Sequence, residues 1–231
     1  MSDAEYRGIG DIIVTARPFD EYAAMFHLTD DDLLAGPVLD CPAGASGFAA
    51  GARALGADVT AVDPEYRASH DDLMLRARRD TEFGNRYVRD TEDTYAWGFF
   101  RDVDDHLARR MAALDAFDVD RRGHPHRYVT GALPDLPFDD GAFRMAVSSH
   151  LLFVYPDHFG YGDHLRCMRE LVRVVTHEVR IFPLVDTTTA PWPHLARLRE
   201  DLASDGVSSD VHPVEYEFIR RGDEMLVLRP G

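Results

Sequence analysis

Three residues whose side chains could take part in catalysis or ligand binding lie at the ends of apolar runs. Asp40 and Asp63 each end a short apolar run, and His150 follows the run 143–148. Such runs predict buried parallel strands, whose carboxyl ends meet at one edge of a sheet. A carboxylate there can accept hydrogen bonds from ribose hydroxyls, and an imidazole can act as a general base near neutral pH. The sequence therefore predicts a ligand site at this edge, with His150 either as the catalytic residue or as a cap of the next element.

The residues between the two acids predict a strand, a tight turn, a helix and a second strand. Residues 41–47 are small or proline, the Ala-rich segment 48–55 favours a helix, and Gly56 suits the carboxyl end of that helix. Backbone N–H groups at the helix start would favour a negatively charged group. The simplest alternative is a βαβ unit that binds no ligand.

The stretch 36–63, GPVLDCPAGASGFAAGARALGADVTAVD, resembles motif I of the class I S-adenosylmethionine-dependent methyltransferases. That family has an acidic residue after strand 1, a glycine-rich turn, and an acidic residue that closes strand 2 and holds the adenosine ribose. The usual D-x-G-x-G-x-G is here D-C-P-A-G-A-S-G. Only Gly44 keeps its register, while Pro42 and Ser46 replace the other two glycines. Proline has no N–H and a fixed φ, so the turn differs from the usual one.

The resemblance implies S-adenosyl-L-methionine as the cofactor and a set of residues that bind it. These residues are Asp40, Cys41, Pro42, Ala43, Gly44, Asp63, Pro64, Leu133 and Ser148. Members of the family often have an acidic residue shortly before L-P-F that meets the adenine amino group. Residues 132–134 are apolar here, so backbone groups or Asp135 are expected to contact the adenine.

Two further segments carry the resemblance and complete the expected fold. Residues 133–152 contain L-P-F, an Asp-Gly loop and an apolar strand in the family's order, and β-runs at 215–220 and 225–229 flank a turn, which predicts a terminal hairpin. We expect a single α/β domain over 1–231, Rossmann-like, with a seven-stranded sheet in the order 3-2-1-4-5-7-6. Strand 7 is expected to be antiparallel, with helices on both faces.

Additional elements are expected around this sheet. Residues 18–35 predict N-terminal cap helices, and the long gap 64–126 predicts a helical insertion with an aromatic-rich segment in its middle. The remaining expectations are helices over 70–79, 102–117, 168–175 and 192–203, a turn over 176–178 and a strand over 179–184.

Substrate contacts are predicted from aromatic and apolar side chains near the same edge. Tyr22 and Met25 on the first cap helix are candidates, although packing on the sheet is at least as good an explanation. Tyr155 is a third candidate, in a loop 153–164 that we expect to form a substrate rim and that also contains His158, Tyr161 and His164. The histidines of this region have no known metal-ligand spacing, so no metal site is expected.

The composition is strongly acidic. The 41 Asp and Glu residues outnumber 25 basic residues, all of them arginine, and the net charge is −16. Absence of lysine with an excess of aspartate suggests a halophilic protein, whose charges are screened over about 3 Å at 1 M salt, although codon bias explains part of it. The charge argues against nucleic-acid binding. Two cysteines, no signal-peptide pattern and no long apolar run predict a cytoplasmic protein without a membrane span.

These features lead to one principal function and two alternatives. The principal function is a methyltransferase that uses S-adenosylmethionine on a small molecule, and the resemblance is to the ubiquinone/menaquinone-biosynthesis type. One alternative is a cofactor-binding protein with little or no transferase activity. The other, an NAD-dependent dehydrogenase, is disfavoured because no G-x-G-x-x-G follows strand 1. The chain is expected to be a monomer or a homodimer.

Overall fold

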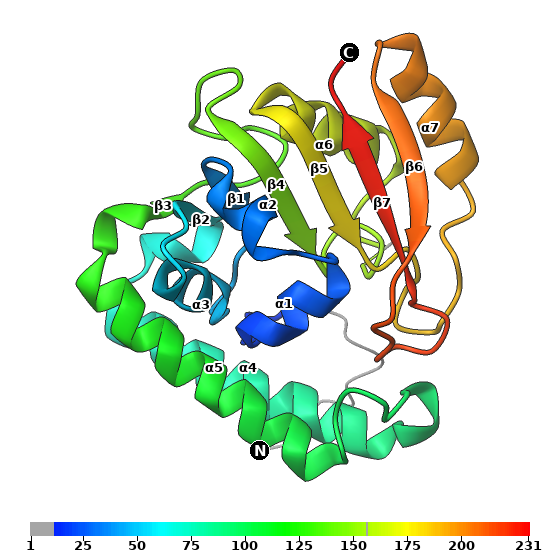
Figure 1. Cartoon of the computed structure of the whole chain (residues 1–231). Helices are drawn as coiled ribbons and strands as arrows, with labels where there is room; N and C mark the ends of the chain where they lie inside the picture. Colours follow the sequence, from blue (N-terminus) through cyan, green and yellow to red (C-terminus); the bar gives the residue numbers. More distant parts are fainter. Residues whose placement is uncertain (1–11, 156) are drawn as a thin grey trace.

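A seven-stranded sheet forms the centre of the structure, a computed structural model that describes residues 12–155 and 157–231 (Figure 1). The spatial order is β3-β2-β1-β4-β5-β7-β6, and β7 is antiparallel to both of its neighbours. The bounds are β1 Val38–Asp40, β2 Val59–Asp63, β3 Tyr128–Thr130, β4 Phe143–Ser149, β5 Val175–Phe182, β6 Ser208–Pro213 and β7 Glu224–Arg229. The predicted strand order and the antiparallel strand 7 are confirmed.

Helices cover both faces of the sheet. The α-helices are α1 Phe19–Met25, α2 Asp30–Leu34, α3 Phe48–Ala54, α4 His70–Asp90, α5 Val103–Gly123, α6 Tyr161–Arg173 and α7 Leu195–Ser204, and the 3-10 helices are η1 Pro64–Arg67, η2 Glu92–Thr94 and η3 Pro125–Arg127. Successive strand residues point to opposite faces. Val38 therefore packs in a core with α1, α3, α4 and α5, whereas Leu39 packs in a second core with α6 and α7.

The register of the central strands brings their carboxyl ends to one edge. Asp40 lies opposite Ala61 of β2 and Val147 of β4, so Asp63 and His150 follow at that same edge. In Figure 1 the arrows of β4 and β5 point toward the end of the molecule where α1, α4 and α5 lie.

The segment between β2 and β3 contains a long helical pair, α4 and α5, which pack side by side (Figure 1). Helix α4 continues to Asp90, well beyond the helix predicted over 70–79, so Phe83 and Tyr87 lie on a helix rather than in a loop. The prediction missed this because polar and charged residues interrupt the apolar stripe after Ala77. The loop after α4 turns Phe100 inward, where it packs against Phe218 at 5.0 Å between ring centroids.

Two predictions near β5 are wrong. Helix α6 begins at Tyr161, seven residues before the predicted start, and β5 begins at Val175, where a helix end and a turn were expected. The start of β5 does not alternate regularly between buried and exposed residues: Val175 is buried, residues 176–177 are both exposed, and the charged Glu178 is buried. The sequence pattern therefore does not reveal this strand. Glu178 is buried because it pairs with Arg180 and Arg229.

The terminal hairpin exists, but its first strand is not the predicted one. Strand β6 is Ser208–Pro213, and residues 214–223 form a long connection to β7 instead of a tight turn. Strand β6 is a polar edge strand that pairs with β7 alone, which weakens its apolar signal. The connection brings Tyr216 and Phe218 under the carboxyl edge, where Phe218 stacks on His106.

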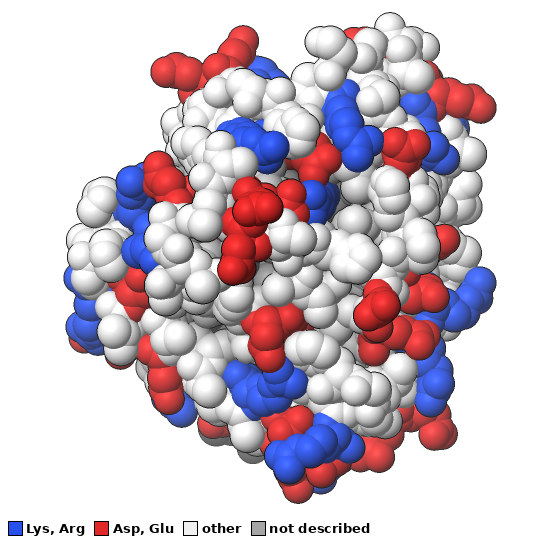
Figure 2. Space-filling model, in the orientation of Figure 1, with Lys and Arg blue, Asp and Glu red and all other residues white. Residues whose placement is uncertain are grey.

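Acidic and basic side chains are interspersed on the face shown in Figure 2. Many arginines lie beside carboxylates; Arg173, for example, pairs with Asp140 at 2.7 Å and with Glu170 at 2.8 Å. Over the described ranges, no helix combines the length and the apolar character that crossing a bilayer requires.

Candidate functional site

A cavity of about 540 Å³ lies at the carboxyl edge of the sheet, and we call it the larger cavity. Its volume is in the range typical of cofactor sites. It is lined by Ile12, Ile13, Val14, Thr15, Cys41, Pro42, Gly44, Asp63, Pro64, Glu65, Arg76, Gly131, Ala132, Leu133, Ser149, His150, Leu151, His158 and Phe159. Six of the nine predicted cofactor residues are among them: Cys41, Pro42, Gly44, Asp63, Pro64 and Leu133.

Asp63 closes β2 at the wall of this cavity. Its two carboxylate oxygens accept hydrogen bonds from the backbone N–H groups of Gly44 and Glu65, each at 2.9 Å. Burial raises its pKa, while these two N–H groups act in the opposite direction. Each oxygen keeps a second lone pair, so the carboxylate can still accept a hydrogen bond from a ligand hydroxyl.

The turn 41–47 does not offer free N–H groups to a ligand. The N–H of Gly44 is bonded to Asp63, that of Ala45 to the Thr15 carbonyl at 3.0 Å, and that of Gly47 to the Arg17 carbonyl at 2.8 Å. Pro42 has no N–H. The donors of the turn are therefore occupied: the arm 12–17 accepts those of Ala45 and Gly47, and Asp63 accepts that of Gly44. The expectation that the start of α3 favours a negatively charged group stays a prediction.

Three predicted cofactor residues, Asp40, Ala43 and Ser148, are buried beside the larger cavity but do not line it. Asp40 accepts a hydrogen bond from the Ser46 hydroxyl at 3.1 Å. Burial raises the pKa of Asp40 well above its usual range, although hydrogen bonds from Ser46 and Tyr22 oppose this. Asp40 is thus placed to support the turn rather than to touch a ligand.

The two candidates on α1 are also in the core. Met25 is fully buried, and Tyr22 stacks on Phe48 with 4.7 Å between ring centroids. Neither lines the two cavities of this edge. Packing on the sheet, the alternative weighed for these residues, is what the structure shows.

His150 follows β4 in a left-handed backbone conformation, with φ of 50°. Its N–H donates to the Phe182 carbonyl at 2.7 Å, and its Nδ1 lies 2.8 Å from the Ser149 hydroxyl. Burial, together with the positive charges of Arg17 and Arg110, holds the pKa of His150 well below its usual value. The imidazole is therefore neutral at neutral pH.

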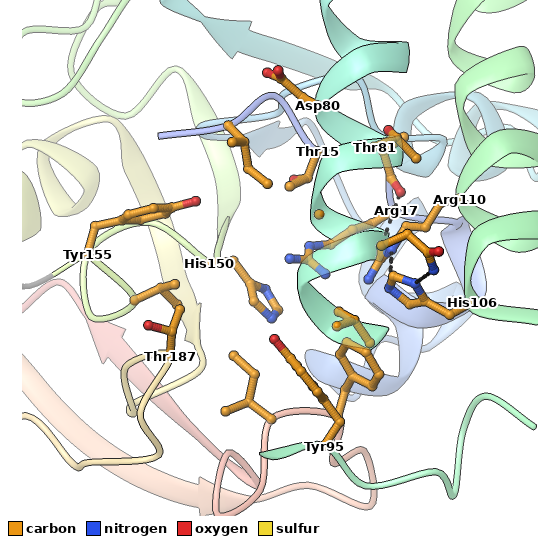
Figure 3. Close-up of a pocket in the computed structure, with 18 residues that line it drawn as sticks. Thr15, Arg17, Asp80, Thr81, Tyr95, His106, Arg110, His150, Tyr155 and Thr187 are labelled. Carbon is orange, nitrogen blue, oxygen red and sulfur yellow. Dashed lines mark hydrogen bonds between the residues drawn. The ribbon is translucent and has the colours of Figure 1, made fainter. Parts of the chain in front are cut away.

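A second cavity, of about 90 Å³, adjoins the first, and we call it the smaller cavity. Figure 3 shows side chains of α4, α5, the arm and the segment after β4 pointing into it. It is lined by Ile13, Thr15, Ala16, Arg17, Asp80, Thr81, Gly84, Asn85, Val88, Tyr95, His106, Arg110, His150, Val154, Tyr155, Thr187, Phe218 and Ile219. The predicted substrate residue Tyr155 is one of them, and His150 belongs to the walls of both cavities.

The sequence did not indicate most residues of the smaller cavity. Thr81 and Asn85 lie in a stretch that was predicted to be outside a helix, and Arg110 reaches the site only because α5 packs against α4. Arg17 and Glu21 form an i,i+4 pair, with Arg17 Nη1 3.1 Å from the carboxylate. This spacing was the one signal in the sequence that could have drawn attention to the arm.

The expected substrate rim 153–164 is divided between the site and the core. Tyr155 and His158 line cavities, whereas His164 is fully buried and stacks on Trp192 at 4.1 Å. Tyr161 starts α6 and bonds to Asp201. Among the described residues, no group of three or more His, Cys, Asp or Glu side chains is arranged to hold a metal ion.

The larger cavity suits the cofactor that the sequence resemblance implies. Asp63 can accept bonds from ribose hydroxyls, Leu133 and Pro64 offer apolar surface to an adenine ring, and Ala132 offers backbone groups beside it. Ile13, Thr15 and His150 line both cavities, so the two cavities meet at these residues. A methionine moiety directed toward the smaller cavity would bring its methyl group toward His150.

Comparison with known proteins agrees with this fold. No family model matches the chain. The uncharacterized protein MJ0045 of Methanocaldococcus jannaschii is 26% identical over 225 residues, which is 97% of this chain and 99% of that protein. The crystal structure of magnesium protoporphyrin IX methyltransferase from Synechocystis PCC 6803, with bound S-adenosylmethionine, matches with a TM-score of 0.50 and 12% identity, over 92% of this chain and 78% of that one.

A second solved structure is also similar. The 1,6-didemethyltoxoflavin-N1-methyltransferase of Burkholderia thailandensis, solved with its substrate and S-adenosylhomocysteine, has a TM-score of 0.46 and 12% identity, over 84% of this chain and 71% of that one. The strand order and the match to the Synechocystis enzyme together show that this chain has the fold of the class I S-adenosylmethionine-dependent methyltransferases.

Proposed function

We propose that the protein is a methyltransferase that uses S-adenosylmethionine and acts on a small molecule. The observation that carries the proposal is that His150 lies in the wall of both cavities. In this proposal the larger cavity binds the cofactor through Asp63, and the smaller cavity holds the acceptor. The quinone-type acceptors that the sequence resemblance implies are one candidate class of small molecule.

The cofactor supplies a methyl group on a sulfonium, a good leaving group, so the chain mainly has to hold the acceptor in line. Proximity of this kind can contribute roughly 7–11 kcal/mol. The smaller cavity, of about 90 Å³, lies between the arm, α4 and the segment after β4. Its size limits the acceptor to a small molecule.

His150 would receive the acceptor's proton when the acceptor is a hydroxyl or an amine. Its Nδ1 is engaged with Ser149, so Nε2 is the ring nitrogen that would take the proton. Because its pKa is held below the usual value, the imidazole is already in its basic form near pH 6.5. The rate should therefore be flat there and fall only at more acidic pH.

The second candidate is a cofactor-binding protein with little transferase activity. The lowered pKa of His150 favours this candidate, because an imidazole with a lowered pKa is a weaker base. A dehydrogenase is a poorer candidate. Its dinucleotide would place a pyrophosphate at the turn 41–47, whose N–H groups at 44, 45 and 47 are already bonded within the chain.

Transfer of a labelled methyl group tests the proposal. The protein is incubated with methyl-labelled S-adenosylmethionine and fractions of a small-molecule extract, and label is sought in low-mass products. With the acceptor in hand, His150→Gln should lower turnover by about 10²-fold while S-adenosylhomocysteine still binds. His126→Gln, at an exposed histidine outside both cavities, is the control. Cofactor binding without any labelled product would favour the second candidate.

A further inference from the structure

We propose that the smaller cavity selects an acceptor that carries one carboxylate, and that Arg17 and Thr81 bind this group. The inference rests on the proposed function, because it names the class of molecule that occupies the acceptor site. It comes from two polar side chains that line the same cavity and have donor groups without partners among residues 12–155 and 157–231.

Arg17 belongs to the arm, and its side chain points into the smaller cavity (Figure 3). The residue is only 8% exposed. Its Nη1 bonds to Glu21, but its Nε is buried and makes no hydrogen bond with the described residues. A buried N–H of a guanidinium without an acceptor is costly, and a carboxylate is the acceptor that a guanidinium matches best.

Thr81 supplies a second donor at the same cavity. It lies on α4, is 6% exposed, and its hydroxyl is buried without a hydrogen-bond partner among the described residues. Arg17 and Thr81 both line the smaller cavity. Few buried polar groups in folded proteins are unsatisfied, so two around one cavity indicate a polar ligand that accepts hydrogen bonds from both.

The charges around the cavity favour a single negative charge on that ligand. Arg17 and Arg110 contribute two positive charges, and Glu21, which both arginines contact, cancels one. Asp80 also lines the cavity, and it belongs to a separate group in which Arg76 pairs with both Asp80, at 3.5 Å, and Glu65. The buried guanidinium groups of Arg17 and Arg110 therefore share the single carboxylate of Glu21, and a ligand carboxylate beside Arg17 would supply a second counter-charge.

Size and lining describe the rest of the acceptor. A cavity of about 90 Å³ has room for roughly six to nine water-sized groups. Val88, Val154 and Ile219 provide apolar walls, and Phe218 adds a ring face. The fitting class is therefore a small carboxylic acid with an apolar or aromatic body, such as a benzoate.

The same charge arrangement acts on His150. Arg17 and Arg110 both lower its pKa, so a carboxylate on Arg17 would offset part of this effect. His150 would then become a stronger base when the acceptor is bound than when the cavity contains only water. Binding of the anion and readiness to take a proton are thereby coupled.

Calorimetric titration of two matched probes tests the proposal. Benzoate and benzamide have nearly the same shape and differ in charge. Each is titrated into the full-length protein saturated with S-adenosylhomocysteine, at one fixed salt concentration. We expect benzoate to bind about 10- to 100-fold more tightly than benzamide, as a charge-assisted pair predicts. Equal affinities, or no binding of benzoate up to its solubility limit, would overturn the proposal.

Variants then assign the preference to residues. Arg17→Gln should bring the ratio of the two affinities close to one, and Thr81→Val should lower it by a smaller factor. Arg144→Gln is the matched control, because Arg144 also has a buried nitrogen without a partner but lies outside both cavities. A preference that survives in folded Arg17→Gln would contradict the assignment. If that variant does not fold, the wild-type comparison and Thr81→Val still decide.

Failure of this inference can be told apart from failure of the proposed function. S-adenosylhomocysteine is titrated first and separately. If it binds and benzoate shows no preference over benzamide, only the acceptor class is wrong. If it does not bind, the proposed function is wrong, and the benzoate comparison without cofactor still tests the carboxylate site.

Discussion

The carboxylate of Glu21 accepts two hydrogen bonds from the guanidinium of Arg110, at 2.6 and 2.8 Å, across 89 positions of the sequence. Arg17 and the Tyr216 hydroxyl bond to the same carboxylate, at 3.1 and 2.6 Å. One fully buried acid thus joins the arm, α1, α5 and the connection between β6 and β7. The arm, α5 and the connection between β6 and β7 all contribute residues to the smaller cavity, so its shape depends on this junction.

Glu21→Gln should destabilise the protein strongly. The change leaves the guanidinium groups of Arg17 and Arg110 buried without a counter-charge, which costs about 3–5 kcal/mol. Denaturant unfolding measures the effect. Asp20→Asn is the control, because Asp20 is exposed and pairs with Arg109 at the surface, where such pairs contribute about 0–1 kcal/mol. Equal losses in the two variants would show that the buried junction has no special role.

Gly44→Ala should disturb the arm rather than only crowd the cofactor. Gly44 has φ of +56°, and a Cβ there would lie 2.8 Å from the Thr15 carbonyl oxygen. The left-handed conformation alone costs a residue with a Cβ about 1–2 kcal/mol. Thermal unfolding should therefore occur at a lower temperature. Gly123→Ala, with open space around it, should be neutral or slightly stabilising.

Acid should destabilise the protein partly through His106. Burial, with help from Arg110 and Arg17, lowers its pKa to about 2. The unfolded chain takes up a proton at this residue below about pH 6.5, while the native state does not, so stability falls as pH drops from 6.5. The loss is about 1.4 kcal/mol per pH unit from this one group.

The slope of stability against pH checks this effect. Between pH 6.5 and 4.5, His106→Gln should show a shallower decline than the wild type, and His126→Gln should not. Parallel curves for wild type and His106→Gln would mean that His106 is protonated in the native state.

The sequence could predict the sheet and one wall of the site because both depend on local signals. Apolar runs and the small-residue turn locate β1, β2 and β4, and three of the proposed cofactor residues, Asp63, Pro42 and Leu133, line the larger cavity. Strand β6 was misplaced because it is a polar edge strand.

The acceptor side could not be predicted, because distant segments form it. Arg17, Thr81 and Arg110 come from the arm, α4 and α5, and only tertiary packing brings them around one cavity. His164 is the opposite case, a residue predicted at the site that lies in the core. Its position in a stretch rich in polar aromatic residues suggested the substrate rim, but it stacks on Trp192 in the core.

The stability of the protein should increase with salt concentration. A net charge of −16 produces self-repulsion that is screened only when the Debye length falls to about 3 Å, near 1 M salt. The midpoint of thermal unfolding should rise steadily from dilute buffer to molar KCl. A midpoint independent of salt would favour codon bias as the origin of the arginine-rich, lysine-free composition.

The central claim is that the larger cavity binds S-adenosylmethionine through Asp63. Calorimetric titration of S-adenosylhomocysteine into the wild type, Asp63→Asn and Asp58→Asn tests it most directly, with NAD as the competing ligand. Asp58 immediately precedes β2, at the other end of the same strand, and pairs with Arg127 at 2.7 Å near the surface. The account predicts one site that binds S-adenosylhomocysteine in the wild type and in Asp58→Asn, weakened about 10- to 100-fold in Asp63→Asn. No binding of S-adenosylhomocysteine by the folded wild type, or a preference for NAD, would contradict it.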